Sequence, residues 1–282
     1  MSEVRPAERP AAARAVRLAR ETRMRDALHA EWTKLRTVSG PSWLLLAIAV
    51  LTVAVSTAAV ASTSCPAGTP CPVDTTRLSL TGIQFGQAVV AILAVLAISN
   101  EYSTGLIRIT LAAVPGRPQV LMAKAVIIGG LVLAAGAAAV LGSVLAGHLI
   151  LPGHGFTAAR GFPAVSLAYG PTLRAATGSV LYLALIALLS LGVAAIVRDS
   201  AVSIGAVLAL LYLFPIIGAF VQNGPWQHRL DRWAPTVAGL AIQHTTGLRS
   251  LPITPWGGLG VLAIWAGAAL LAGGLALGLR DA

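Results

Sequence analysis

The side chains that could do chemistry within the apolar parts of this sequence are few, and two amides are the most distinctive. Gln84 and Gln87 lie three residues apart in the apolar stretch 80–99, so a helix would place both on one face. A carboxamide both donates and accepts hydrogen bonds. These two side chains can therefore bond to a neighbouring helix or line the path of a substrate, and the sequence leaves both interpretations open.

The two cysteines form a second candidate, because they are close together in Cys65-Pro-Ala-Gly-Thr-Pro-Cys71. In an oxidising compartment they could close a disulfide, and otherwise they would be two free thiols. Two local ligands are too few for a zinc site. We therefore expect no metal here.

Motifs for catalysis do not occur. The chain has no Gly-x-x-x-x-Gly-Lys-Ser/Thr loop, no His-Glu-x-x-His and no Gly-x-Ser-x-Gly, and its five histidines are scattered. The net charge of +10 does not lie on a basic folded module. We expect no catalytic residue, no metal ligand and no nucleic-acid partner.

The elements that carry these residues are long stretches without charge. The chain of 282 residues is 56% hydrophobic and 11% charged, with a mean hydropathy of +0.81. Its uncharged stretches reach the roughly 20 residues that a helix needs to cross a bilayer. We predict an all-α polytopic membrane protein with six spans at approximately 42–61, 80–99, 125–151, 175–197, 200–221 and 256–279.

The distribution of basic residues predicts the orientation. Six of the 20 Lys and Arg residues would lie outside, three of them in the last outer loop, and the other 14 inside. The six are Arg77, Arg160, Arg174, Arg229, Arg232 and Arg249. We expect a cell-membrane protein with both termini cytoplasmic. Ala59-Val60-Ala61 has the form of a signal-peptide cleavage site, but the preceding basic region is long, which favours an uncleaved span.

The N-terminal region divides in two. Residues 1–22 are expected to form a disordered tail. Residues 23–38 place four apolar side chains at helical spacing, which predicts an amphipathic helix in the cytoplasmic interface or, alternatively, a solvated lead-in. The four are Met24, Leu28, Trp32 and Leu35. Gly40-Pro41 should break the chain before the first span.

Two loops and two helices have features of their own. The inner loop 100–124 should be structured, as a membrane-surface helix or as a docking element for a cytoplasmic partner. The outer loop 222–255 should form a re-entrant or interfacial element.

Spans four and five must form a tight hairpin, and Pro215 should kink the fifth. A small-residue stripe in the third span favours close helix packing: Gly130, Ala134, Ala138, Gly142 and Ala146.

No Asp or Glu lies inside any predicted span. Ion-coupled transporters usually place an ionisable group in the membrane. The absence favours an energy source outside this chain.

Two segments resemble the ABC-2 type permease family, in its actinobacterial form. Glu31-Trp32-Thr33-Lys34-Leu35-Arg36-Thr37 resembles the lead-in helix of that family, and Asn100-Glu101-Tyr102-Ser103-Thr104-Gly105-Leu106-Ile107-Arg108 resembles its coupling loop. Pro115 follows in the same pattern. Leu106 departs from it, since the family often has Thr there. The residues that the resemblance assigns to coupling with an ATPase are Glu101, Tyr102, Gly105, Leu106, Arg108, Leu111, Arg117 and Lys124.

The resemblance implies a type V exporter-like transmembrane domain over residues 39–282. It further implies a permease subunit that is not itself an enzyme and exports substrate from the cytoplasm. ATP and Mg²⁺ would bind a separate ATP-binding subunit, no cofactor would bind this chain, and a second copy or a paralogue would complete a dimer within the lipid bilayer. Glu101 would begin a helix in the loop, and Arg108 and Arg117 would pair with carboxylates on the ATPase. The alternatives are a stand-alone secondary transporter and a membrane scaffold or sensor.

Overall fold

The computed structural model describes residue 33 and residues 39–66, 71–103, 117–220 and 224–279. Helices joined by short turns make up this part of the chain, which contains no strand. The long helices are α2 (Ser39–Ser62), α4 (Ile83–Ser103), α6 (Arg117–Ile150), α7 (Gly170–Val197), α8 (Ser200–Phe220) and α11 (Pro255–Leu279). The short ones are α3 (Thr75–Ser79), α9 (Gly224–Trp233), α10 (Pro235–Leu240), η1 (Leu151–His154), η2 (Ala158–Arg160), η3 (Ala241–Gln243) and η4 (Leu248–Ser250).

The six long helices of the described chain are each long and apolar enough to cross a membrane. This confirms the prediction of six long apolar helices, which indicate a multi-pass membrane protein. The largest difference from the predicted bounds is in α6, which begins at Arg117 rather than near residue 125. Gly40 and Pro41 do not precede the first span as a break, because they lie in the first turn of α2, where proline fits a helix.

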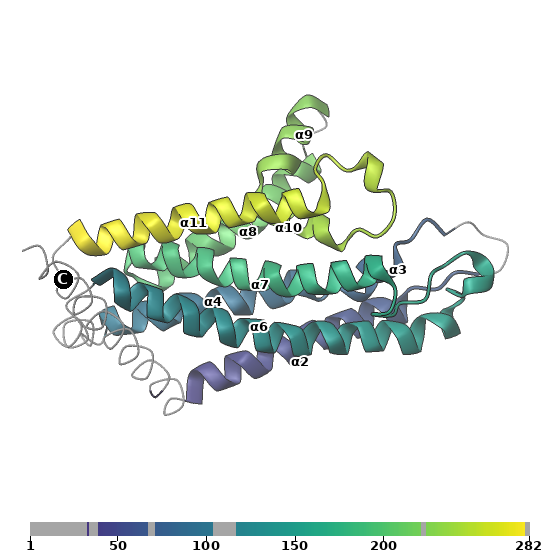
Figure 1. The fold of residues 1–282 in the computed structure, drawn as a ribbon, viewed down its shortest axis with the longest axis horizontal. Coiled ribbons are helices and arrows are strands. Elements are labelled where there is room, and N and C mark those ends of the chain that lie inside the picture. Colours follow the sequence, from purple (N-terminus) through teal and green to yellow (C-terminus); the bar gives the residue numbers. More distant parts are fainter. Residues whose placement is uncertain (1–32, 34–38, 67–70, 104–116, 221–223, 280–282) are drawn as a thin grey trace, which may run out of the picture.

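The long helices run side by side along the long axis of the molecule (Figure 1). We call the end that carries Cys65 and Cys71 the disulfide end, and the end where α4 stops and α6 starts the loop end. Helix α2 begins and α11 finishes at the loop end. The start of α2 and the end of α11 therefore lie on the same side of the bundle, as an even number of spans requires.

Helix α7 forms the centre of the bundle, packed against α4, α6 and α11. Tyr182, Leu183 and Ile186 on this helix are fully buried. Close contact with α11 depends on Gly192, where an added Cβ would lie 2.5 Å from the carbonyl carbon of Ala269. The helix pair approaches so closely because small residues let the two backbones meet.

Two residues, Arg198 and Asp199, connect α7 to α8. Arg198 ends α7 in the left-handed conformation, with φ 65°, and its N–H donates to the carbonyl of Ala194 at 2.9 Å. Asp199 then caps α8, because its Oδ1 accepts from the N–H of Val202 at 2.8 Å. This confirms the predicted tight hairpin. Helix α8 continues through Pro215 to Phe220.

Helix α6 has 34 residues, which corresponds to a length of about 51 Å. Its small-residue stripe meets α2 at Gly142, where an added Cβ would lie 2.7 Å from Val53. At Gly130 nothing lies within 4 Å, so the stripe supports close packing over only part of its length. Exposed apolar side chains run along the rest of the helix, among them Met122, Leu141, Leu145 and Leu149.

The predicted outer segment 222–255 contains two unlike helices. Helix α9 projects sideways from the bundle near the start of α11 (Figure 1). Helix α10 and η3 instead pack against α7, α8 and α11. Gly239 on α10 reaches the ring of Tyr182, about 18 Å along α7 from its first residue.

Candidate functional site

A cavity of about 490 Å³ lies toward the disulfide end, between α4, α8, α9, α10 and the segments that follow α10. Amide, hydroxyl and charged side chains share its wall with aliphatic ones. The polar lining comprises Arg77, Gln84, Gln87, Tyr212, Gln227, Asp231, Thr236, Gln243 and His244. Both amides that the sequence singled out therefore line one cavity.

The α4 wall is held in place by two tyrosines from different helices. The hydroxyl of Tyr182 donates to Oε1 of Gln87, and both side chains are buried. The hydroxyl of Tyr212 donates to the backbone carbonyl of Gln84 at 2.5 Å. Gln87 thus bonds between helices and also lines the cavity, whereas Gln84 is exposed. The two interpretations that the sequence left open are not exclusive.

The opposite wall comes from α10 and η3. Oγ1 of Thr236 donates to the carbonyl of Leu211 at 2.8 Å, and Nε2 of Gln243 donates to Oγ of Ser179 at 3.2 Å. These bonds anchor the short helices to α8 and α7, which positions Val237 and Leu240 along the cavity. A wall of neutral donors and acceptors among aliphatic groups suits an amphipathic molecule.

Asp74 holds the segment at the rim of the cavity, Thr245 and Thr246, in place through hydrogen bonds. Its carboxylate accepts from the N–H of Thr245 at 2.6 Å, from Oγ1 of Thr245 at 2.7 Å and from the N–H of Thr246 at 3.1 Å. It also caps α3 through the N–H of Arg77. Burial acts to raise the pKa of Asp74, but the bonds from Thr245, Arg77 and Thr246 together hold that pKa below its ordinary value.

His244 lies on the same rim. Burial lowers the pKa of its imidazole, the nearby Arg77 lowers it further, and Asp74 opposes both effects. Nη2 of Arg174 donates to the backbone carbonyl of His244 at 2.5 Å, which ties this segment to α7. At neutral pH the imidazole is therefore uncharged and can accept or donate a hydrogen bond.

A second polar group lies at the loop end. Nζ of Lys124 on α6 donates to Oε1 of Glu101 on α4 at 2.8 Å, and the residues are only 3% and 6% exposed. The expectation that Glu101 begins a helix is wrong, because it lies in the last turn of α4. There the helix dipole disfavours a carboxylate, and Lys124 compensates.

The same residue corrects a second expectation. The candidate span in α4, Ile83–Tyr102, includes Glu101. The candidate span in α6, Gln119–His154, includes Lys124. A carboxylate therefore does lie within a candidate span. It was missed because the predicted spans stopped at the last uncharged residue, whereas a paired charge is tolerated near a helix end.

Arg198 joins three helices beside this pair. Its guanidinium lies 5.3 Å from the ring centroid of Tyr102 on α4, and Nη2 donates to the carbonyl of Ala276 on α11 at 3.0 Å. Oγ of Ser200 donates to Oγ of Ser99 at 2.9 Å. These contacts fasten the α7–α8 hairpin to α4 and α11 at the loop end.

Much of the predicted coupling segment lies outside the described residues. This holds for Gly105, Leu106, Arg108 and Leu111, and for the four residues of the interfacial helix, Met24, Leu28, Trp32 and Leu35. Arg117 begins α6, but its side chain is also outside the description. Of the predicted coupling residues, the structure brings together Glu101 and Lys124, with Tyr102 next to Glu101.

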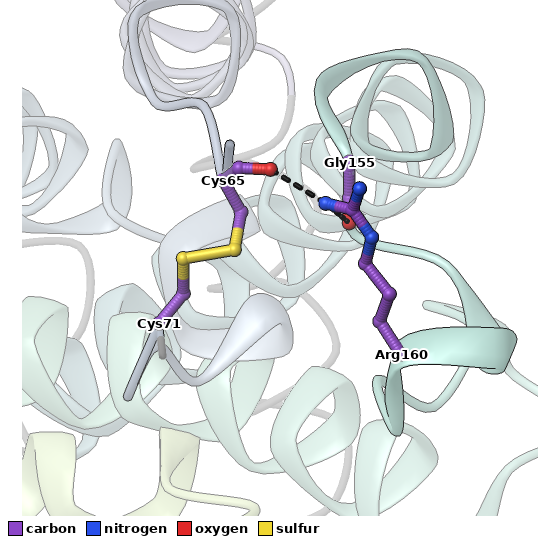
Figure 2. The surroundings of a disulfide bond; sticks show 4 residues. All are labelled: Cys65, Cys71, Gly155 and Arg160. Atoms are coloured by element: carbon purple, nitrogen blue, oxygen red, sulfur yellow. Dashed lines mark hydrogen bonds between the residues drawn. A yellow bond between two sulfur atoms is a disulfide. The ribbon is translucent and has the colours of Figure 1, made fainter. Parts of the chain in front are cut away.

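Cys65 and Cys71 form a disulfide at the opposite end of the bundle (Figure 2). Nη1 of Arg160 donates to the carbonyl of Cys65 at 2.7 Å, and the N–H of Cys65 donates to the carbonyl of His154 at 2.9 Å. The loop after α2 is thereby joined to the segment after α6.

Sequence reasoning missed Tyr182, Tyr212, Thr236 and Gln243. A tyrosine hydroxyl inside an apolar helix needs a hydrogen-bond partner, so Tyr182 and Tyr212 carried a usable signal. Thr236 and Gln243 carried none, because only the fold brings α10 and η3 to the cavity that α4 also lines. No three His, Cys, Asp or Glu side chains of the described residues gather as a metal site would require.

The chain matches no protein-family model and no curated protein.

Proposed function

We propose that this chain is the membrane-spanning permease subunit of an ATP-binding cassette exporter, in which a separate subunit hydrolyses ATP. The chain lies in the cell membrane with the loop end in the cytoplasm and the disulfide end outside. Six apolar helices and a disulfide at one end support this orientation, because disulfides persist in an oxidising exterior. The resemblance of residues 31–37 and 100–108 to ABC-2 permeases supplies the family.

The observation that carries the proposal is the cavity lined by Gln84 and Gln87. It lies toward the proposed outer face, where an exporter releases its substrate. Its neutral amides and hydroxyls can orient a polar group, while Val237 and Leu240 cover an apolar one. The cavity fits an amphipathic substrate.

Helix α4 provides a route from ATP hydrolysis to this cavity. Gln84 and Gln87 lie near its first residue and Glu101 near its last, so that Gln87 and Glu101 are about 21 Å apart along the axis. The pair with Lys124 joins the end of α4 to the start of α6, and these helices bracket residues 104–116. A force applied to that segment by a partner would move both helices together and reach the cavity wall.

The proposed assembly contains two ATP-binding subunits, which hold ATP and Mg²⁺, and a second copy of this chain or a paralogue. The test is purification of the full-length chain, co-expressed with the ATP-binding subunit, into lipid nanodiscs. The two should purify together, and the chain should raise the rate of ATP hydrolysis by the partner. A chain that purifies alone and changes no partner's ATP hydrolysis would overturn the proposal.

One observation favours a second candidate, an ion-coupled secondary transporter. Glu101 and Lys124 are ionisable, buried and within candidate spans, which is where such transporters carry a coupling proton. The two candidates separate in sealed vesicles. A secondary transporter would drive export from a proton gradient without ATP, and Glu101→Gln would abolish that dependence. The proposed permease would require ATP whether or not a gradient is present.

A further inference from the structure

The last segment on the disulfide side is rich in arginine. Arg229, Arg232 and Arg249 stand there against one carboxylate, Asp231. Extracellular loops of membrane proteins are usually poor in Lys and Arg. The proposed transport function assigns these arginines no role.

Helix α9 separates its charges onto two faces. Gln227 and Asp231, four residues apart, line the 490 Å³ cavity. Arg229, Arg232 and Trp233 share another face and line a second hollow, of about 400 Å³, together with Pro252. The carboxylate is thus directed toward one cavity, and two guanidinium groups line the other.

The second hollow lies where the polar surface of a bilayer is expected. Trp233 is 63% exposed, and the same end of the bundle exposes Tyr169 and Trp256 at the starts of α7 and α11. Exposed aromatic residues of this kind collect at the level of lipid headgroups. Nε1 of Trp265 donates to the carbonyl of Trp233 at 3.1 Å, which fixes the end of α9 against α11.

The direction of α9 fits the same level. It projects sideways from the bundle, across the direction of the spans (Figure 1). An amphipathic helix with arginine and tryptophan in this direction lies in the plane of the interface. Its arginine face is then within reach of phosphate groups in the adjoining leaflet.

We propose that the hollow formed by Arg229, Arg232, Trp233 and Pro252 binds the phosphate group of an anionic phospholipid in the outer leaflet. The orientation rests on the proposed function. The site adjoins the transport cavity at Pro252, but its two arginines and Trp233 do not line that cavity. Each guanidinium forms two parallel hydrogen bonds with phosphate oxygens, a geometry that an ammonium group lacks. Trp233 packs against the glycerol region. A lipid phosphate at this hollow accounts for the two arginines on this face of α9.

The test measures lipid binding to the full-length chain in detergent by native mass spectrometry. Phosphatidylglycerol should bind about tenfold more tightly than phosphatidylcholine, whose choline cancels the phosphate charge. R229Q and R232Q should each weaken phosphatidylglycerol binding about tenfold. R249Q is the matched control, because it removes the same charge from an exposed site outside the hollow, and it should bind like the parent.

Three results would overturn the proposal. R249Q could weaken binding as much as R232Q does, which would indicate attraction by net charge alone. Inorganic phosphate at millimolar concentration could displace all bound lipid, which would indicate a site for a soluble anion. R232K keeps the charge but lacks the two parallel N–H donors of a guanidinium. If R232K retained full affinity, the bidentate contact with phosphate would be excluded.

Discussion

The ion pair between Glu101 and Lys124 offers the sharpest test of the bundle, because its two partners come from adjacent helices and are both buried. Their oxygen and nitrogen atoms are 2.8 Å apart. At an effective dielectric constant of about 20, the attraction between such charges is roughly 6 kcal/mol. Burying both ions offsets much of this attraction, so the pair itself contributes little net stability.

Replacing one partner of the pair should lower the unfolding free energy more than replacing both partners. Glu101→Gln leaves the ammonium group of Lys124 buried without a counter-charge, and Lys124→Met does the same to Glu101. Each single variant should lose about 3–5 kcal/mol of unfolding free energy, whereas the double variant should lie within about 1–2 kcal/mol of the parent. The coupling energy of the double-mutant cycle should therefore be several kcal/mol.

The assay is equilibrium unfolding of the purified chain in mixed micelles, followed by tryptophan fluorescence. Arg249→Gln is the control, since an exposed charge outside any network should change stability by less than about 0.5 kcal/mol. If the losses from the two single variants simply add in the double variant, the two side chains act independently. The proposed link between α4 and α6 would then be refuted.

Three further outcomes follow from other parts of the fold. Because the pKa of His244 is lowered, the unfolded chain binds more protons below about pH 6.5, so the melting temperature should fall from pH 7 to pH 5, and His244→Gln should remove part of that fall. Gly192→Leu should cost at least about 1–3 kcal/mol in the same unfolding assay, whereas Gly260→Leu, in open space, should cost about 1 kcal/mol or less. Replacing Cys65 and Cys71 with Ser should leave transport largely intact, and thiol labelling should detect cysteine in the parent only after reduction.

The number of spans and their approximate positions could be predicted from the sequence, because a charge in lipid is costly and its absence over a long stretch is therefore informative. The bounds were less predictable. Charged residues marked the predicted limits, but Lys124 and Glu101 neutralise each other, so α4 and α6 extend past them. A charge pattern read along one chain does not reveal which charges pair across helices.

One wall of the candidate site could be predicted from the sequence, and the facing wall could not. Gln84 and Gln87 stand out within an apolar helix, so their sequence context singles them out. The wall that faces them includes Thr236 and Gln243, which lie in a connection between two spans, where such polar residues are common. Their place in the cavity depends on α10 packing beside Tyr182, a contact between distant parts of the chain that no local pattern encodes.

The length of α6 has a consequence for the membrane around the protein. Exposed apolar side chains extend from Met122 to Leu149, about 40 Å along the helix axis. A typical hydrocarbon layer is about 30 Å thick, so covering this surface would need a tilt of about 40°, at the upper limit for membrane helices. Without that tilt, the surrounding lipid must stretch to meet α6. Such hydrophobic mismatch favours thicker membranes, so lipids with longer acyl chains should gather beside this helix.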